Sequence, residues 1–282
     1  MAIWTDGDIH SSNGTPIHYY RTGDGSKPAV VLLHGFTDYG LCWSRVAKEL
    51  EDDYDVVMID AVGHGHSGGT EHGFRGRASG DVLAVIAGLG LNRPAVMGHS
   101  MGAGTAAEVA AKSPEVVRAL LLEDPGWRYV QPTANDPVAD NGGGSRAALG
   151  TPSWRAWATA FKNLSKEERY AETVIERPEW HEAELGPWAE AKALLDFSVF
   201  DEPRSVGVQP WREIAPQITA PTLLITANPE RGGIVTPETA KEALELLPHG
   251  RTVNFPEARH NVRREAYAGF IAAVTSFLKE TV

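Results

Sequence analysis

The sequence has little cysteine, no long apolar run and a deficit of positive charge. Its single cysteine, Cys42, cannot form an intramolecular disulfide, and a lone thiol is more often a small packing residue than a nucleophile. Residues 1–14 contain neither the basic region nor the apolar stretch of roughly 7–15 residues that a secretory signal needs. The apolar runs at residues 29–33 and 119–122 are far shorter than the roughly 20 residues of a membrane-spanning helix. We therefore expect a soluble, cytoplasmic protein.

Acidic residues outnumber basic ones. With 37 Asp and Glu against 26 Lys and Arg, the formal net charge is −11 and the sequence pI is about 5.4. Such a surface repels the phosphates of nucleic acids and anionic lipid head groups, so we expect neither nucleic acid nor a membrane as a partner. A small molecule is the remaining class of partner. Of the 282 residues, 42% are hydrophobic, which is enough for one large core or for a core with an inserted lobe.

Short apolar runs alternate with longer helix-like segments. Residues 9–20 are typical of a β-hairpin, because Asn13-Gly14 favours a type I′ turn between two extended segments. Runs rich in Val, Ile and Leu predict further strands at residues 29–33, 56–59, 94–97, 119–122, 222–225 and 252–255. Helices are predicted between them at residues 44–50, 79–89, 101–112, 237–247 and 264–279. This alternation indicates an α/β protein with a mostly parallel sheet that helices cover on both faces.

Residues 127–211 interrupt the alternation. They contain no clear buried strand, and helical patterns between residues 152 and 200 follow a polar loop at residues 136–144. Six of the eight tryptophans fall in this segment: Trp127, Trp154, Trp157, Trp180, Trp188 and Trp211. We interpret the segment as a helical cap, inserted into a core that comprises residues 1–126 and 212–282.

The pentapeptide Gly98-His99-Ser100-Met101-Gly102 carries the strongest chemical signal. It matches Gly-x-Ser-x-Gly directly after a predicted strand and directly before a predicted helix, which is the context of a nucleophile elbow. The serine of such an elbow takes a strained backbone conformation, and larger side chains two positions before and after it would clash. The helix that starts here directs its free N–H groups toward the site and favours an oxyanion. Ser100 is therefore the candidate nucleophile.

A second source of N–H groups follows the predicted strand at residues 29–33. His34-Gly35-Phe36 occupies the place where enzymes with this elbow supply another oxyanion donor. The side chain matters little there, because the peptide N–H makes the contact. We therefore predict an oxyanion hole formed by the backbone N–H groups of Phe36 and Met101.

The candidate general base is His260. It lies between the last predicted strand and the final helix, where a loop at the carboxyl edge of the sheet can reach a serine on a neighbouring strand end. The nine other histidines lie on the N-terminal hairpin, in the motifs above, in a glycine-rich loop at residues 63–72, or at positions expected on the surface.

No metal or cofactor is expected. The segment Gly63-His-Gly-His-Ser67 is rich in glycine after a strand, but it matches neither of the nucleotide-binding motifs G-x-G-x-x-G and G-x-x-x-x-G-K-[ST]. His64, His66 and His72 have no carboxylate or cysteine at ligand spacing, which argues against zinc.

The order of these motifs resembles the α/β-hydrolase superfamily. HGF at residues 34–36, DAVGHGHS at 60–67, GHSMG at 98–102 and a late histidine follow one another as they do in that superfamily, and the resemblance covers nearly the whole chain except the insert. It implies an α/β-hydrolase fold with an eight-stranded sheet, a mobile cap and a Ser–acid–His triad.

The resemblance leaves two candidates for the acid of the triad. Most relatives have an aspartate in the loop after the seventh strand, where this sequence has Glu230 in Ala227-Asn-Pro-Glu230. A minority, including haloalkane dehalogenases and zearalenone lactonases, place the acid at the end of the sixth strand, 24 residues after the nucleophile. Asp124 has this spacing from Ser100. We favour Asp124 and keep Glu230 as the alternative.

The tryptophan-rich insert predicts an apolar pocket. Trp127, Trp154 and Trp157 are the candidate substrate-binding residues, although tryptophan also serves to pack a cap against a core. The expected function is a carboxylic ester hydrolase, a serine esterase or lactonase that cleaves hydrophobic or aromatic substrates. The alternatives are a carbon–carbon bond hydrolase or a cofactor-free perhydrolase with the same triad and, in another class, a ligand receptor on a hydrolase fold. Ser100 argues against haloalkane dehalogenases and epoxide hydrolases, which need an aspartate at this position.

Overall fold

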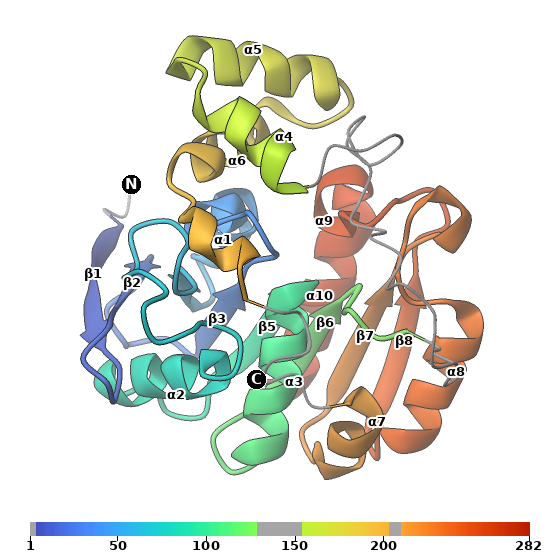
Figure 1. Cartoon of the computed structure of the whole chain (residues 1–282). Helices are drawn as coiled ribbons and strands as arrows, with labels where there is room; N and C mark the ends of the chain where they lie inside the picture. Colours follow the sequence, from blue (N-terminus) through green and yellow to red (C-terminus); the bar gives the residue numbers. More distant parts are fainter. Residues whose placement is uncertain (1–3, 129–153, 203–209) are drawn as a thin grey trace.

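The computed structural model of the chain describes residues 4–128, 154–202 and 210–282 (Figure 1). Eight strands of these residues form one sheet. Their bounds are β1 (Thr5–His10), β2 (Pro16–Arg21), β3 (Ala29–Leu33), β4 (Asp55–Ile59), β5 (Ala95–His99), β6 (Ala119–Glu123), β7 (Thr222–Thr226) and β8 (Gly250–Asn254).

The strands have the order β1-β2-β4-β3-β5-β6-β7-β8 across the sheet. β1 and β2 form an antiparallel hairpin and β2 pairs antiparallel with β4, whereas every pair from β4 to β8 is parallel. Parallel strands end at the same edge of a sheet, so the loops that follow β3, β5 and β6 meet there. The α/β-hydrolase fold and the mostly parallel eight-stranded sheet predicted from the sequence are confirmed.

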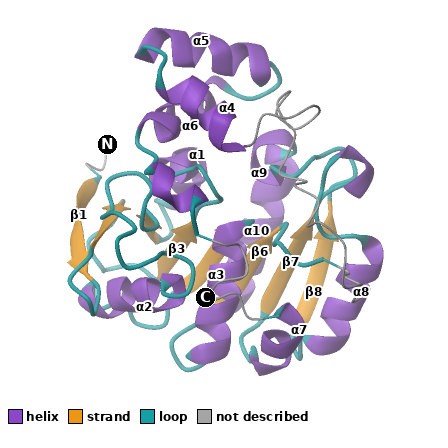
Figure 2. Ribbon diagram, in the orientation of Figure 1, coloured by secondary structure: helices purple, strands orange, loops and turns teal. Residues whose placement is uncertain are grey.

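Helices cover both faces of the sheet (Figure 2). They are α1 (Ser44–Leu50), α2 (Ala78–Gly88), α3 (Met101–Lys112), α4 (Trp154–Lys162), α5 (Lys166–Glu176), α6 (Glu182–Ala193), α7 (Trp211–Ile214), α8 (Pro237–Leu246), α9 (Val262–Glu265) and α10 (Tyr267–Thr281). Among the described residues, short 3₁₀ turns accompany them: η1 (Gly40–Trp43), η3 (Phe197–Phe200), η4 (Ala215–Gln217) and η5 (Pro229–Arg231). Within the described ranges, no helix is both long enough and apolar enough to span a bilayer.

The alternation of side chains along the central strands builds one apolar core on each face. On β3, Val31 and Leu33 belong to a cluster with residues of α2, α3 and α8, whereas Val30 and Leu32 belong to a second cluster with residues of α1 and α10. Successive side chains of a strand point to opposite faces, so a strand that is covered on both faces is apolar throughout. This explains the continuous apolar runs in the sequence, because every residue of β3 to β7 is buried.

Three helices, α4 to α6, lie between β6 and β7 in the chain and gather at the top of Figure 1. We call them the insert helices. A small apolar cluster of Phe161, Trp180, Leu185 and Trp188, with Trp157 at its side, packs α4 against α6. Helix α6 also contacts η1 and α1 of the core. It is therefore α6 that holds the insert helices against the part of the core that follows β3.

Two local details differ from the sequence prediction. The predicted type I′ turn needs a positive φ at both Asn13 and Gly14, but Gly14 alone of the two has one, at 83°. The Gly14 N–H donates to the Ser11 carbonyl, which closes a turn centred on Ser12 and Asn13 and not on Asn13 and Gly14, so the predicted turn type is wrong. The helix predicted at residues 264–279 is divided into α9 and α10 at Ala266, which lies outside helical geometry with a φ of −128°.

Candidate active site

Ser100 occupies the sharp turn between β5 and α3. Its φ of 52° and ψ of −110° lie outside the conformations that L-residues favour. Two glycines make this turn possible: a Cβ on Gly98 would overlap the backbone of Gly102, and a Cβ on Gly102 would overlap the carbonyl of Leu33. Ser100 is half-buried and lines a cavity, so the turn presents this side chain to the cavity rather than to the core.

His260 and Asp124 form a hydrogen-bonded pair next to this turn. The Nδ1–H of His260 donates to Asp124 Oδ2 at 2.6 Å. Asp124 follows β6 directly and is fully buried, and its carboxylate also accepts the N–H groups of Ile234 at 2.9 Å and Val235 at 3.0 Å. A buried carboxylate needs such donors. They fix the orientation of the carboxylate, which in turn fixes the imidazole of His260.

Glu230, the alternative acid, lies in η5 at an exposed position. Its backbone N–H donates to Asn228 Oδ1 at 2.9 Å, which fixes the turn but leaves the carboxylate in solvent. The structure thus brings Asp124, and not Glu230, to His260. Strand β6 is the direct neighbour of β5, and the Ser100 N–H donates to the carbonyl of Glu123 at 2.9 Å. The residue after Glu123 is therefore held close to the nucleophile elbow.

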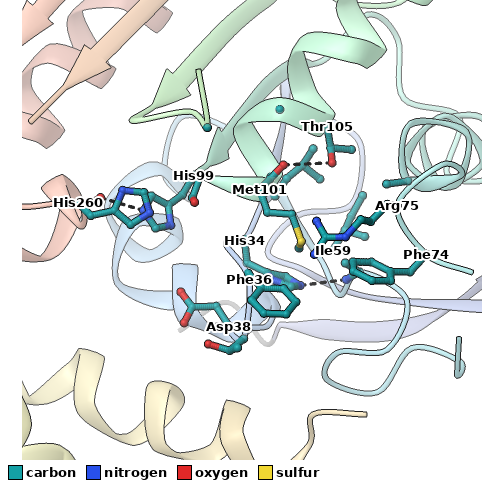
Figure 3. Close-up of a pocket in the computed structure, with 18 of the residues that line it drawn as sticks. His34, Phe36, Asp38, Ile59, Phe74, Arg75, His99, Met101, Thr105 and His260 are labelled. Atoms are coloured by element: carbon teal, nitrogen blue, oxygen red, sulfur yellow. Dashed lines mark hydrogen bonds between the residues drawn. The ribbon is translucent and has the colours of Figure 1, made fainter. Parts of the chain in front are cut away.

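Ser100 and His260 line one cavity of about 490 Å³, a volume that suits a small organic molecule. Figure 3 shows His260 beside His99 on one side of the cavity, and Phe74 and Arg75 on the other. The Ser100 hydroxyl makes no hydrogen bond with the described residues. In sites without substrate, catalytic hydrogen bonds are often long and shorten only when substrate binds.

Phe36 and Met101, whose N–H groups are the predicted oxyanion donors, line the same cavity. Met101 is the first residue of α3, so its N–H has no acceptor within the helix. The N–H of Phe36 makes no hydrogen bond to the part of the chain that the structure describes. The loop after β3 passes close to the elbow, because a Cβ on Gly35 would lie 3.5 Å from the Cβ of Ser100. Both N–H groups are thus available near Ser100.

His99, inside the elbow motif, supports the backbone of His260. Its Nε2–H donates to the carbonyl of His260 at 2.9 Å, and the two ring centroids are 4.6 Å apart. Burial lowers the pKa of His99 well below its ordinary value, and the charge of Arg263 lowers it further. His99 is therefore neutral at physiological pH. Sequence reasoning placed His99 in the motif but did not identify this contact.

Sequence reasoning also missed a buried ion-pair network beside the site. The carboxylate of Asp38 accepts hydrogen bonds from Arg263 at 2.9 Å and from Arg264 at 3.0 Å. Arg263 also donates to Glu123, and Arg264 donates to Glu184 of α6, each at 3.1 Å. Burial raises the pKa of Asp38, but the surrounding cations, Arg264 foremost, outweigh burial and hold this pKa below its usual range. The pair Arg263-Arg264 is visible in the sequence as a basic cluster, but its burial is not.

The three predicted substrate-binding tryptophans all line the cavity. Trp127 is 3% exposed and stacks on Trp211 with ring centroids 5.2 Å apart, so much of its surface serves the core. Trp154 and Trp157 are half-buried on α4, and the Trp154 ring lies 6.0 Å from the ring of Phe36. Within the described ranges, no group of three or more His, Cys, Asp or Glu side chains is arranged to hold a metal ion.

Comparison with known proteins identifies the family of this chain. A model of the alpha/beta hydrolase family matches residues 30–273, which is most of the chain. The chain belongs to this family. This α/β hydrolase is 28% identical to N-formylmaleamate deformylase of Pseudomonas putida KT2440 over 284 residues, which cover 99% of this chain and 98% of the deformylase.

Solved structures share the fold of this α/β hydrolase. The N-formylmaleamic acid deformylase of Pseudomonas putida S16 superimposes with a TM-score of 0.73 at 22% identity, over 96% of this chain and all of that one. An esterase from Exiguobacterium antarcticum superimposes with a TM-score of 0.68 at 20% identity, over 96% of this chain and 98% of that one. At these identities the likeness concerns the fold.

Proposed function

We propose that this α/β hydrolase is a serine hydrolase that cleaves carboxylic esters or lactones through an acyl-enzyme on Ser100. The observation that carries the proposal is the 2.6 Å hydrogen bond between His260 Nδ1 and Asp124 Oδ2, at the cavity that Ser100 lines. An imidazole whose Nδ1 is held by a carboxylate presents its free Nε2 as a base.

In the proposed reaction, His260 Nε2 takes the proton of the Ser100 hydroxyl as its oxygen attacks the substrate carbonyl. The tetrahedral oxyanion accepts hydrogen bonds from the N–H groups of Phe36 and Met101. Its collapse breaks the bond to the leaving oxygen, which takes the proton from His260. Water then attacks the acyl-enzyme in the same way, with His260 again as the base, and releases the acid. Asp124 stays ionised throughout and stabilises the imidazolium.

Aromatic side chains support a hydrophobic or aromatic substrate. Trp127, Trp154 and Trp157 line the cavity with Phe36 and Phe74. Flat apolar walls favour flat apolar ligands, because their contact removes apolar surface from water. We therefore propose esters or lactones with an aromatic or aliphatic group as substrates, rather than small charged ones.

A second candidate is hydrolysis of an N-formyl amide by the same residues. The name of the deformylase that matches over the full length of this chain supports it, because N-formylmaleamate is an N-formyl amide that carries a carboxylate. Arg75 and Arg177 also line the cavity. Guanidinium groups bind carboxylates well, so these side chains favour an anionic substrate in this second case.

The test is covalent labelling combined with a substrate panel. A fluorophosphonate is expected to label the wild-type protein at Ser100. Ser100→Ala is expected to abolish labelling and to lower the turnover of p-nitrophenyl esters by about 10⁶-fold. Ser113→Ala is the matched control, because Ser113 lies at the opposite end of α3, and it should label like the wild type.

Each outcome of this test is informative. Labelling with ester or lactone turnover supports the first candidate, and labelling with turnover of N-formyl amides alone supports the second. A wild-type protein that is not labelled, or a Ser100→Ala variant that keeps its turnover, would contradict the nucleophile. Labelling without turnover of any ester, lactone or N-formyl amide would favour carbon–carbon bond cleavage, perhydrolysis or a receptor instead.

A further inference from the structure

The turn that carries Phe36 has an unfavourable backbone conformation. Residues 35–38 form a tight turn in which the Asp38 N–H donates to the carbonyl of Gly35 at 3.1 Å. Its third residue, Thr37, has a φ of 66°. Glycine or asparagine is favoured at such a position, and a β-branched residue there is an outlier that persists only when its surroundings enforce it. Phe36, a predicted oxyanion donor that is labelled in Figure 3, directly precedes Thr37 in the sequence.

A lysine from the insert helices contacts this turn. Lys192 lies near the end of α6 and is fully buried. Its Nζ donates to the carbonyl of Thr37 at 2.7 Å and lies 3.6 Å from Asp38 Oδ1. The same ammonium lies 4.2 Å from the centroid of the Trp188 ring. A residue about 155 positions away in the chain thus contacts the backbone next to the predicted oxyanion hole.

The charge of Lys192 lowers the pKa of Asp38, second only to that of Arg264, but its ammonium lies 3.6 Å from Asp38 Oδ1, beyond hydrogen-bond distance. That carboxylate already accepts hydrogen bonds from Arg263 and Arg264. Burial lowers the pKa of Lys192 to about 8, while Asp38 opposes the shift, so keeping the ammonium here is costly. Removing one member of a buried ionic network is destabilising, so a variant at Lys192 needs a readout that separates catalysis from folding. The specific contact that Lys192 adds is the hydrogen bond to the carbonyl of Thr37.

We propose that Lys192 is a positioning residue for the oxyanion hole. Its bond to Thr37 holds the turn in the conformation that points the Phe36 N–H at the oxyanion. Because Lys192 belongs to α6, this bond makes the oxyanion hole complete only when α6 is seated on the core. The inference rests on the proposed function, since it requires a tetrahedral oxyanion formed at Ser100.

The test separates binding of the oxyanion from binding of the substrate. Lys192→Met removes the donor and keeps an unbranched chain of similar length. With a p-nitrophenyl ester we expect kcat to fall about 10–100-fold and KM to change less than about threefold, because loss of an oxyanion donor affects the transition state selectively. A boronic acid, which forms a tetrahedral adduct with a serine hydroxyl, should lose affinity by a similar factor to kcat.

Two further variants act as controls. Lys192→Arg keeps a charged donor and is expected to restore most of kcat. Lys162 also donates to a backbone carbonyl, that of Leu195 at 2.8 Å. This bond lies away from the turn at residues 35–38, so Lys162→Met should not change kcat. Thr37→Gly makes the positive φ favourable, so Lys192→Met should cost less kcat in that background than alone.

The outcomes distinguish this inference from the proposed function. If the wild type shows neither fluorophosphonate labelling nor ester turnover, the proposed function fails. If the wild type and Ser100→Ala behave as expected but Lys192→Met keeps kcat and boronic acid affinity, the inference alone is wrong. A fall in kcat with an equal rise in KM would indicate a merely structural role and would also overturn it. If Lys192→Met does not fold, Lys192→Gln, which is neutral and shorter, is judged by the same kcat and KM criteria.

Discussion

At the scale of single residues, two carboxylates differ sharply in their surroundings. Asp124 is buried and binds His260 and two backbone N–H groups, whereas Glu230 is exposed. We expect Asp124→Asn to lower kcat by about 10⁴-fold, because an amide disfavours the tautomer of His260 that leaves Nε2 free. Glu230→Gln should leave kcat within about twofold of the wild type, because a solvated carboxylate away from His260 contributes little. Steady-state kinetics of both variants on one ester measures this difference. A large loss of kcat in Glu230→Gln but not in Asp124→Asn would identify Glu230, in the loop after β7, as the acid of the triad.

The sequence could not separate these two residues, for a physical reason. Both follow a strand of the parallel sheet, and both could reach a loop at its carboxyl edge. What distinguishes them is the pair of N–H groups from Ile234 and Val235, which lie 110 and 111 positions after Asp124. A contact over such a distance leaves no local pattern. The same holds for Lys192, since an isolated lysine in a predicted helix is normally expected at the surface.

At the scale of elements, the turn between β5 and α3 depends on the absence of a side chain. In Gly98→Ala, the new Cβ would overlap the backbone of Gly102, so the strand end or the helix must move. We expect a loss of about 1–3 kcal/mol in the free energy of unfolding, together with lower ester turnover. Gly104→Ala is the matched control on α3, because a methyl group added there would meet no described atom within 4 Å beyond its own helix backbone.

Gly104→Ala should raise the free energy of unfolding by about 0.5–1 kcal/mol, because alanine loses less backbone entropy in a helix than glycine. Urea unfolding of both variants checks the pair. Equal changes in the free energy of unfolding of the two variants would mean that steric overlap at position 98 does not destabilise the turn.

Most strands and core helices were predictable because each carries its own signal. Strands covered on both faces show continuous apolar runs, and Gly-x-Ser-x-Gly marks the junction of β5 and α3. The turn after β1 and the break in the last helix were not predictable. The first depends on how β1 and β2 pair, and the second on the turn at Ala266, neither of which has a simple sequence pattern. The predicted cap at residues 127–211 stays a prediction, since part of it lies outside the described residues.

At the scale of the whole molecule, buried histidines make stability depend on pH. Burial lowers the pKa of His34, lowers that of His64 to about 3, and lowers that of His99 well below 6.5. The folded state therefore keeps these rings neutral, while the unfolded chain binds protons below about pH 6.5. Since the unfolded state binds more protons there, stability is full above pH 6.5 and falls as the pH decreases, by up to about 1.4 kcal/mol per pH unit for each ring.

Urea midpoints at pH 7.5, 6 and 5 measure this effect. We expect the midpoint to fall between pH 6.5 and 5, before most carboxylates titrate. His64→Phe keeps an aromatic ring against its neighbours and removes one titrating group, so its midpoint should fall less steeply. A midpoint that stays constant down to pH 5 in the wild-type protein would contradict neutral buried histidines.

Three side-chain-bearing residues at the site, Thr37, Ser100 and Asp124, have a positive φ. Each such conformation costs about 1–3 kcal/mol, and a domain usually has only about 5–15 kcal/mol of net stability. The strained conformations at the site therefore offset a large part of the net stability that the sheet and its two cores provide. The chain should therefore tolerate few destabilising substitutions, even far from the cavity. Evolution toward higher activity would have to begin with substitutions elsewhere that raise the free energy of unfolding.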